Sequence, residues 1–132
     1  MTEAEWLACA DPTEMVGFLG HRASDRQIRL FAVAWEQIAA TVRRYRNHPA
    51  DYLRDIFGNP FRPVAFFRAW RTDTTVALAR QMYKERDFSA MPILADALQD
   101  VGCDNEDILD HCYRWKPHVR GCWVVDKVLD KK

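Results

Sequence analysis

The sequence predicts an all-α protein, a compact single-domain bundle of six to eight helices that covers residues 1–132. Capping residues recur ahead of apolar segments, and within those segments apolar side chains return every three or four residues, which gives a helix one apolar face. The two segments of strand-like composition, 64–67 and 123–125, are short and lie inside better helical patterns. We therefore expect no substantial sheet.

Two short helices are expected at the N-terminus. Thr2 and Glu5 have the spacing of a capping box, which predicts a helix that includes Trp6. Asp11 directly before Pro12 predicts the start of a second helix, which Gly20 can end.

The longest helix is expected to start at Ser24 or Asp25 and to run to the basic residues before Pro49. Its predicted core-facing stripe consists of Ile28, Phe31, Trp35, Ile38 and Val42. A short helix should follow from Pro49 through Ile56.

Residues 57–63 are predicted to form an ordered loop, because Gly58-Asn59-Pro60 consists of residue types that are typical of turns. Phe57 and Phe61 flank this turn, and we expect both rings to pack on the core.

Further helices are predicted toward the C-terminus. Their expected capping residues are Asp73, Ser89, and Asp104 or Asn105. An apolar face with Ile93, Leu94 and Leu98 should end at Gly102. Pro117 is expected in the first turn of a final helix. The apolar stripe of that helix would consist of His118, Cys122, Val125 and Leu129.

Composition narrows the classes of function. The chain has 19 basic and 19 acidic residues, so it lacks the net positive charge that nucleic-acid binders usually carry. It shows no membrane-spanning segment, and its acidic N-terminus does not resemble a secretory signal. We therefore expect a cytoplasmic protein whose four cysteines are reduced. Neither a phosphate-binding glycine loop nor a Gly-x-Ser-x-Gly elbow is present, so an enzyme is the less favoured reading.

One group of residues could bind zinc. Cys103, Cys112, His118 and Cys122 supply four ligands of the type that zinc prefers, and the last two are four apart on a predicted helix. A reactive thiol at Cys122, activated by His118, is a related alternative. However, no closely spaced cysteine pair is present, and reduced cysteine is among the most buried residue types. We therefore favour buried thiols without metal.

A second group is basic and aromatic and lies between residues 43 and 71. The arginines of this patch are Arg43, Arg44, Arg46, Arg62, Arg68 and Arg71. Arginines with interleaved aromatic rings can hold phosphates and stack on bases. Residues 96–110 carry six carboxylates and no Lys or Arg, so pairing between the two segments, within or between chains, is the favoured alternative. Nucleic-acid binding, if present, should be weak and sensitive to salt.

Three blocks resemble a bacterial family of hypothetical proteins. They read RDIFGNPFRP at 54–63, LADAL-x3-GC at 94–103 and HVRGCWVVD at 118–126. The family has no assigned activity, so the resemblance implies kinship and no function. The segment between the longest helix and the first block is shorter here than in family members.

Three functions remain, in order of preference. The first is a non-catalytic helical module that docks on another protein or on itself, because aromatic residues and arginine are enriched at interfaces. The second is a nucleic-acid-associated accessory protein that uses the patch at 43–71. The third is a small zinc- or thiol-dependent enzyme that uses the C-terminal cysteines and histidine.

Overall fold

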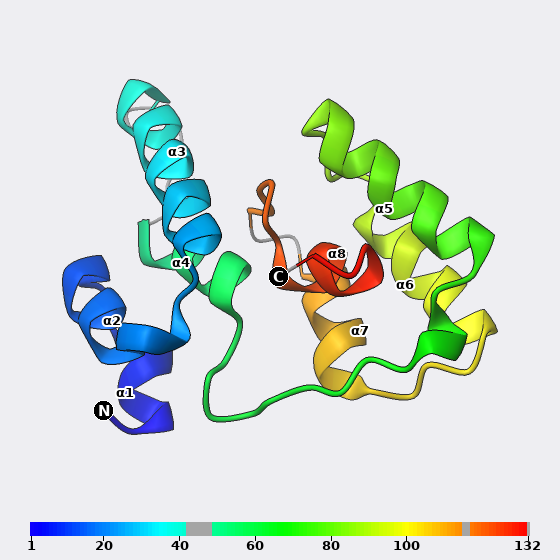
Figure 1. Ribbon diagram of the computed structural model, residues 1–132, viewed down its shortest axis with the longest axis horizontal. Coiled ribbons are helices and arrows are strands. Elements are labelled where there is room, and N and C mark those ends of the chain that lie inside the picture. The colour runs from blue at the N-terminus through cyan, green and yellow to red at the C-terminus, as the bar shows by residue number, and fades with distance from the viewer. Residues whose placement is uncertain (42–48, 115–116, 132) are drawn as a thin grey trace. The chain divides into compact units, whose positions relative to one another are not determined.

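The computed structural model describes residues 1–41, 49–114 and 117–131, with the side chains of 37–41 left out (Figure 1). These residues form eight α-helices, two 3₁₀-helices and no strand, which confirms the all-α prediction. None of the helices in the described ranges is long and apolar enough to cross a membrane.

Contacts divide the chain into two units. The first unit comprises Met1–Pro63 and Lys116–Cys122, and the second comprises Val64–Trp115 and Trp123–Lys132. Each unit is therefore built from two separate stretches of the chain. The single domain expected over residues 1–132 stays a prediction.

The first unit contains four α-helices and one 3₁₀-helix. They are α1 (Glu3–Ala8), α2 (Pro12–Leu19), η1 (Gly20–Arg22), α3 (Asp25–Thr41) and α4 (Pro49–Phe57). The predicted caps are confirmed: Thr2 Oγ1 accepts from the Glu5 N–H, and Asp11 Oδ1 accepts from two N–H groups at the start of α2. Ser24 and Gln27 exchange hydrogen bonds, each 3.1 Å long, at the start of α3.

The core of the first unit lies where α4 packs against α2 and α3. Its buried side chains are Trp6, Met15, Leu19, Phe31, Ala50, Leu53 and Ile56. Because α4 is short, its apolar face has only three such residues, and each of them is fully buried. Burial of this kind provides most of a short helix's stability.

The expected stripe on α3 is partly wrong. Phe31 and Ala34 are buried, whereas Trp35 is 41% exposed. The Trp35 ring lies at the edge of the buried face, where it meets the Phe31 ring edge-on at a centroid distance of 5.6 Å. The side chain of Ile38, and Val42 as a whole, lie outside the described residues.

The second unit contains four further α-helices and a 3₁₀-helix. They are η2 (Arg68–Trp70), α5 (Asp73–Glu85), α6 (Met91–Asp100), α7 (Glu106–Tyr113) and α8 (Trp123–Val128). Helix α5 packs against α6 and α8, and α7 packs against the same two helices. Met82, Leu94, Leu98, Ile108 and Val125 are among the side chains buried there.

Local signals in the second unit are confirmed in part. Asn105 caps α7, and Gly102, with φ +98°, follows α6 as expected. The predicted caps of α5 and α6 are wrong. Thr72 rather than Asp73 caps α5, and Ala90 rather than Ser89 is at the N-cap position of α6, which starts at Met91. The Ser89 N–H donates instead to the Asp87 carboxylate, which closes a local turn before the helix.

Two further expectations for the C-terminal half are wrong. Ile93 is 57% exposed, because the buried face of α6 is centred on Leu94, Ala95 and Leu98. The final helix starts at Trp123 rather than at Pro117, so neither His118 nor Cys122 lies on a helix.

Two leucine variants test the core of the first unit. Leu53 is fully buried, so Leu53→Ala should lower the free energy of unfolding by about 2–5 kcal/mol. Leu7 is 54% exposed, so Leu7→Ala should change it by no more than about 0.5 kcal/mol. Urea denaturation followed by far-UV circular dichroism measures both, and equal losses would contradict this core.

Candidate functional site

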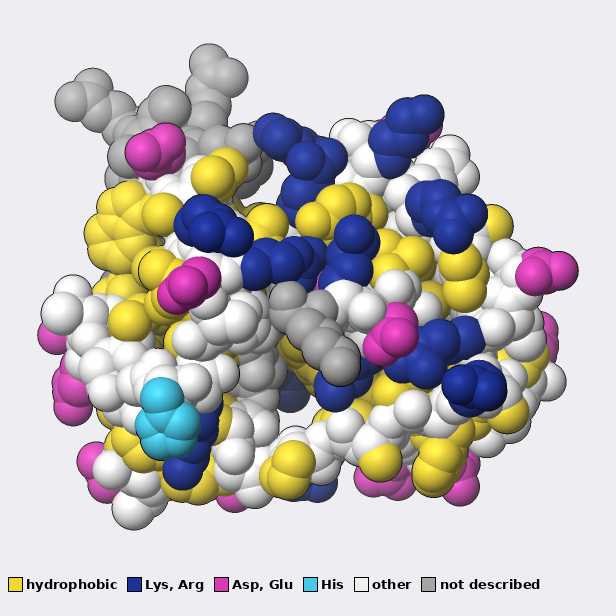
Figure 2. Space-filling view, in the orientation of Figure 1, with side chains coloured by type: hydrophobic (Ala, Val, Ile, Leu, Met, Phe, Trp, Pro, Cys, Tyr) yellow, Lys and Arg dark blue, Asp and Glu magenta, His cyan; other side chains and the backbone are white. Residues whose placement is uncertain are grey.

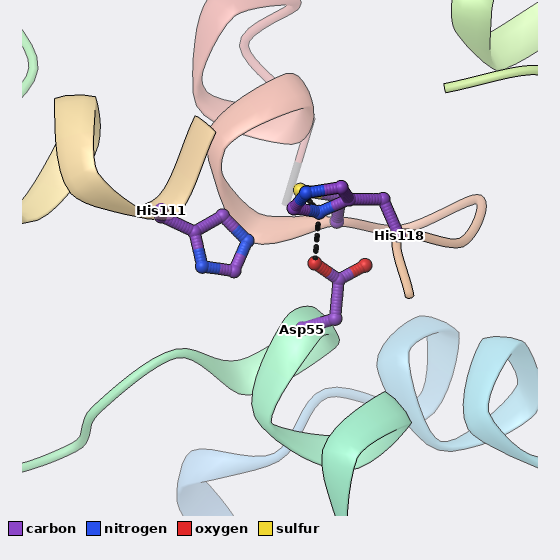
Figure 3. Close-up of side chains that lie close together, drawn as sticks. Asp55, His111 and His118 are labelled. Atoms are coloured by element: carbon purple, nitrogen blue, oxygen red, sulfur yellow. Dashed lines mark hydrogen bonds and ion pairs between the residues drawn. The ribbon is translucent and has the colours of Figure 1, made fainter. Parts of the chain in front are cut away.

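The carboxylate of Asp55 is the centre of a buried polar cluster in the first unit (Figure 3). Asp55 lies on α4 beside Ile56, and its side chain is 2% exposed. Its Oδ1 atom is 2.8 Å from His118 Nδ1, and its Oδ2 atom accepts the Val119 N–H at 2.8 Å. An ionised carboxylate only accepts hydrogen bonds, so the Nδ1 atom of His118 is the donor. Both oxygens thus have partners, as burial of a carboxylate requires.

A tight turn brings Cys122 back toward His118. The Cys122 N–H donates to the Val119 carbonyl at 2.9 Å, and Gly121 takes φ +102°, a conformation that favours glycine. The Cys122 Sγ atom thereby lies 3.9 Å from His118 Nδ1. The two residues are close, as the sequence predicted, but because of a turn rather than helical spacing.

We name Asp55, His118 and Cys122 the Asp55 cluster. One ligand atom from each residue lies within 4.8 Å of the other two. Asp55 was not among the residues that the sequence predicted as ligands. The available signal was a carboxylate directly beside Ile56 on an amphipathic helix.

The geometry of the Asp55 cluster does not favour a thiol enzyme. A Cys-His-Asp relay places the carboxylate on one ring nitrogen and the thiol on the other, so that the imidazole can take the thiol proton. Here Asp55 Oδ1 and Cys122 Sγ both approach Nδ1 of His118. A nitrogen that donates to Asp55 cannot accept a proton from the thiol.

The other predicted ligands, Cys103 and Cys112, belong to the second unit. Both are buried, as is Cys122, in agreement with the expected burial of these three thiols, and none of the four cysteines forms a disulfide. Cys103 directly follows Gly102, and its N–H donates to the Leu98 carbonyl at 2.9 Å. Cys112 lies on α7, as does His111, whose ring is 5.2 Å from that of Trp123.

Arginines of the predicted basic patch have different environments. Arg43, Arg44 and Arg46 lie outside the described residues, and Arg62 and Arg68 are exposed. The Arg71 guanidinium donates two hydrogen bonds, of 3.0 and 2.9 Å, to the Lys127 carbonyl on α8.

Arg54, from the same stretch of sequence, also binds backbone. Its guanidinium donates to the carbonyls of Trp6 and Cys9 at the end of α1, and it pairs with Asp51 at 3.3 Å. Arg54 and Arg71 therefore hold helices within their own units. Pairing of the patch with residues 96–110 stays a prediction.

An exposed aromatic surface is the second candidate site. Phe61 is 36% exposed, so its expected place in the core is wrong. Its ring stacks on Phe18 at a centroid distance of 5.4 Å and an interplanar angle of 13°. The Arg22 guanidinium lies 5.7 Å from the centre of the Phe18 ring. We name Phe18, Arg22 and Phe61 the Phe61 surface.

Comparisons with known proteins do not assign a function. No protein-family model, curated protein or solved structure matches this chain. The resemblance to a bacterial family of hypothetical proteins therefore stays a prediction, and the functional argument rests on the geometry of the two candidate sites.

Gly121→Ala tests the turn that positions Cys122. A Cβ atom at this position would lie 2.8 Å from Leu30 Cδ1, and the positive φ is strained for any other residue. We expect a loss of about 1–3 kcal/mol in the free energy of unfolding. Gly17→Ala is the control, because its Cβ would meet nothing within 4 Å on helix α2. That variant should gain about 0.5–1 kcal/mol, and a Gly121→Ala protein as stable as the parent would disprove the turn.

Alkylation tests the environment of Cys103. Burial raises the pKa of this thiol above its usual value, and the Asp104 carboxylate raises it further. A hydrogen bond from the Asn105 backbone lowers the pKa but does not outweigh burial. Since the thiolate is the nucleophile, iodoacetamide should modify Cys103 far more slowly in the native protein than in urea, as peptide mass spectrometry can measure.

The raised pKa of Cys103 also predicts the direction of a pH effect on stability. The folded protein keeps the thiol proton to higher pH than the unfolded chain, whose thiol pKa is about 8.5. The stabilisation is complete below that pH and is lost as pH rises through the folded pKa. Cys103→Ala should therefore show a shallower alkaline decline in unfolding free energy, and an identical decline would contradict the assignment.

Proposed function

We propose that this protein is a non-catalytic helical interaction module that associates with a second copy of itself through the Phe61 surface. The observation that carries the proposal is the exposed Phe61 ring, held in one position on Phe18. Several apolar side chains reach the surface among charged ones (Figure 2). Trp35 and Phe67 are exposed too and meet a neighbouring ring edge-on, whereas Phe61 lies nearly parallel to its partner. Aromatic and arginine side chains of this kind dominate binding energy at interfaces.

Asn59 supports the proposal because it orders the loop that carries Phe61. Its Oδ1 atom accepts the Phe61 N–H at 2.9 Å, and its side-chain amide donates to Glu3 on α1 at 3.1 Å. The Arg62 N–H donates to the Asn59 carbonyl, which closes the turn. A side chain fixed before binding loses little conformational entropy on association, so the ring is suited to act as an anchor.

The choice of a second copy follows from the chemistry of the surface. It contains both an exposed aromatic ring, Phe61, and an exposed cation, Arg22. A twofold arrangement brings the same patch of two copies together, so that Arg22 of each can lie over Phe61 of the other. Cation–π contacts of this type are stronger when water is excluded.

Two other assignments complete the proposal. Four cysteines without a disulfide fit a reducing compartment, so we propose that the protein lies in the cytoplasm of a bacterial cell. Nucleic-acid binding through the exposed Arg62 and Arg68 is the alternative. It is less favoured because Arg71, from the same patch, binds the Lys127 carbonyl.

Sedimentation velocity over a range of protein concentrations tests the proposal. We expect a reversible monomer–dimer equilibrium for the parent chain and a monomer for Phe61→Asp, since a carboxylate in the interface centre would be buried against apolar surface. Arg22→Glu should weaken the dimer as well. Ile93→Asp is the matched control, because Ile93 is exposed on α6 outside the Phe61 surface. A parent chain that stays monomeric at all concentrations, or a Phe61→Asp dimer of unchanged strength, would overturn the proposal.

A further inference from the structure

We infer that the Asp55 cluster is a zinc-binding site, with Asp55 Oδ1, His118 Nδ1 and Cys122 Sγ as ligands. This departs from the metal-free thiols that the sequence favours, and it replaces Cys103 and Cys112 in the sequence-based ligand set with Asp55. All three ligands belong to the first unit. The inference is independent of the proposed self-association.

The types and spacing of the donor atoms carry the argument. Carboxylate oxygen, imidazole nitrogen and thiolate sulfur are the three ligand types that zinc takes in proteins. Around a tetrahedral zinc ion, such donors lie about 3.4–3.6 Å apart, given the usual metal–ligand distances. In the structure Nδ1 of His118 is 2.8 Å from the oxygen and 3.9 Å from the sulfur. The ion therefore fits between these atoms if the two separations change by less than about 1 Å.

Charge supports the same assignment. All three side chains are largely buried, where an uncompensated charge is costly. The Asp55 carboxylate and the Cys122 thiolate together carry two negative charges, which a divalent cation neutralises. His118 binds the ion as the neutral ring with its proton on Nε2, so the ion replaces the Nδ1 proton that Asp55 holds in the empty site. The occupied site then has no net charge.

The surrounding backbone orients the ligands. The Val119 N–H holds Asp55 Oδ2 at 2.8 Å, which leaves Oδ1 as the oxygen that faces His118. Hydrogen bonds of this kind to a ligand carboxylate fix its direction and tune the metal. The turn at Gly121 directs the Cys122 sulfur to the same point.

Cobalt(II) is the probe for the test, because it takes zinc sites and its bond to a thiolate gives a charge-transfer absorption band in the near ultraviolet. The full chain is stripped with a chelator under reducing conditions and titrated with Co²⁺. We expect one equivalent to bind with this band, and Zn²⁺ to displace it, since zinc binds more tightly than cobalt to such ligands.

Single variants identify the ligands. Cys122→Ser should abolish the band, whereas Cys9→Ser, Cys103→Ser and Cys112→Ser should keep it. Changes to residues that only hydrogen-bond a metal ligand typically weaken metal binding about 10- to 100-fold. His118→Gln and Asp55→Asn should each weaken Co²⁺ binding by more than this. Circular dichroism reports whether each variant is folded, and if Asp55→Asn unfolds, Cys122→Ser and His118→Gln decide the result.

Three outcomes would overturn the inference. They are the absence of a thiolate band in the parent chain, a band that persists in Cys122→Ser, and a band that disappears in both Cys103→Ser and Cys112→Ser. The last outcome would favour the ligand set Cys103, Cys112, His118 and Cys122 instead.

Discussion

Two hydrogen bonds to the carboxylate of Asp55 are the constraint on which the C-terminal part of the first unit depends. They join α4 to His118 and Val119, residues that lie 63 and 64 positions further along the chain. Removal of either partner would take a hydrogen bond from a buried carboxylate, which costs more than a surface contact contributes. The same two bonds determine where the following turn begins, and hence where the thiol of Cys122 lies. The structural tether and the proposed zinc site thus share one carboxylate.

The features that the sequence predicted well are those determined by neighbouring residues. The caps at Thr2, Asp11 and Asn105 form between groups two or three positions apart, so their spacing is visible in the sequence. The glycine that ends α6 acts over a similar range. Where the prediction was wrong by one residue, as at Thr72, a neighbouring residue of similar chemistry took the cap.

The candidate sites depend on contacts that local patterns do not contain. Pro117 is a valid helix-start signal, but His118 and Val119 bind to α4, and the segment stays non-helical until Trp123. The spacing of His118 and Cys122 predicted proximity on one face of a helix, whereas the two residues are close because of the turn at Gly121. Phe61 is apolar, yet Asn59 and Phe18 hold it at the surface. Asp55 for His118 and Val119, and Phe18 for Phe61, are contacts between residues distant in sequence.

The interleaving of the two units has a consequence for biosynthesis. Lys116–Cys122 completes the first unit, but the ribosome makes it only after Val64–Trp115, and Trp123–Lys132 of the second unit follows still later. Asp55 is therefore synthesised well before its hydrogen-bond partner His118. Formation of this contact closes the chain between the two residues into a long loop, which has an entropic cost. The usual order, in which the N-terminal part folds first during translation, does not apply to such a chain. Both units reach their final form only after synthesis has passed residue 122, so apolar surface that the folded units bury stays exposed on the nascent chain until then.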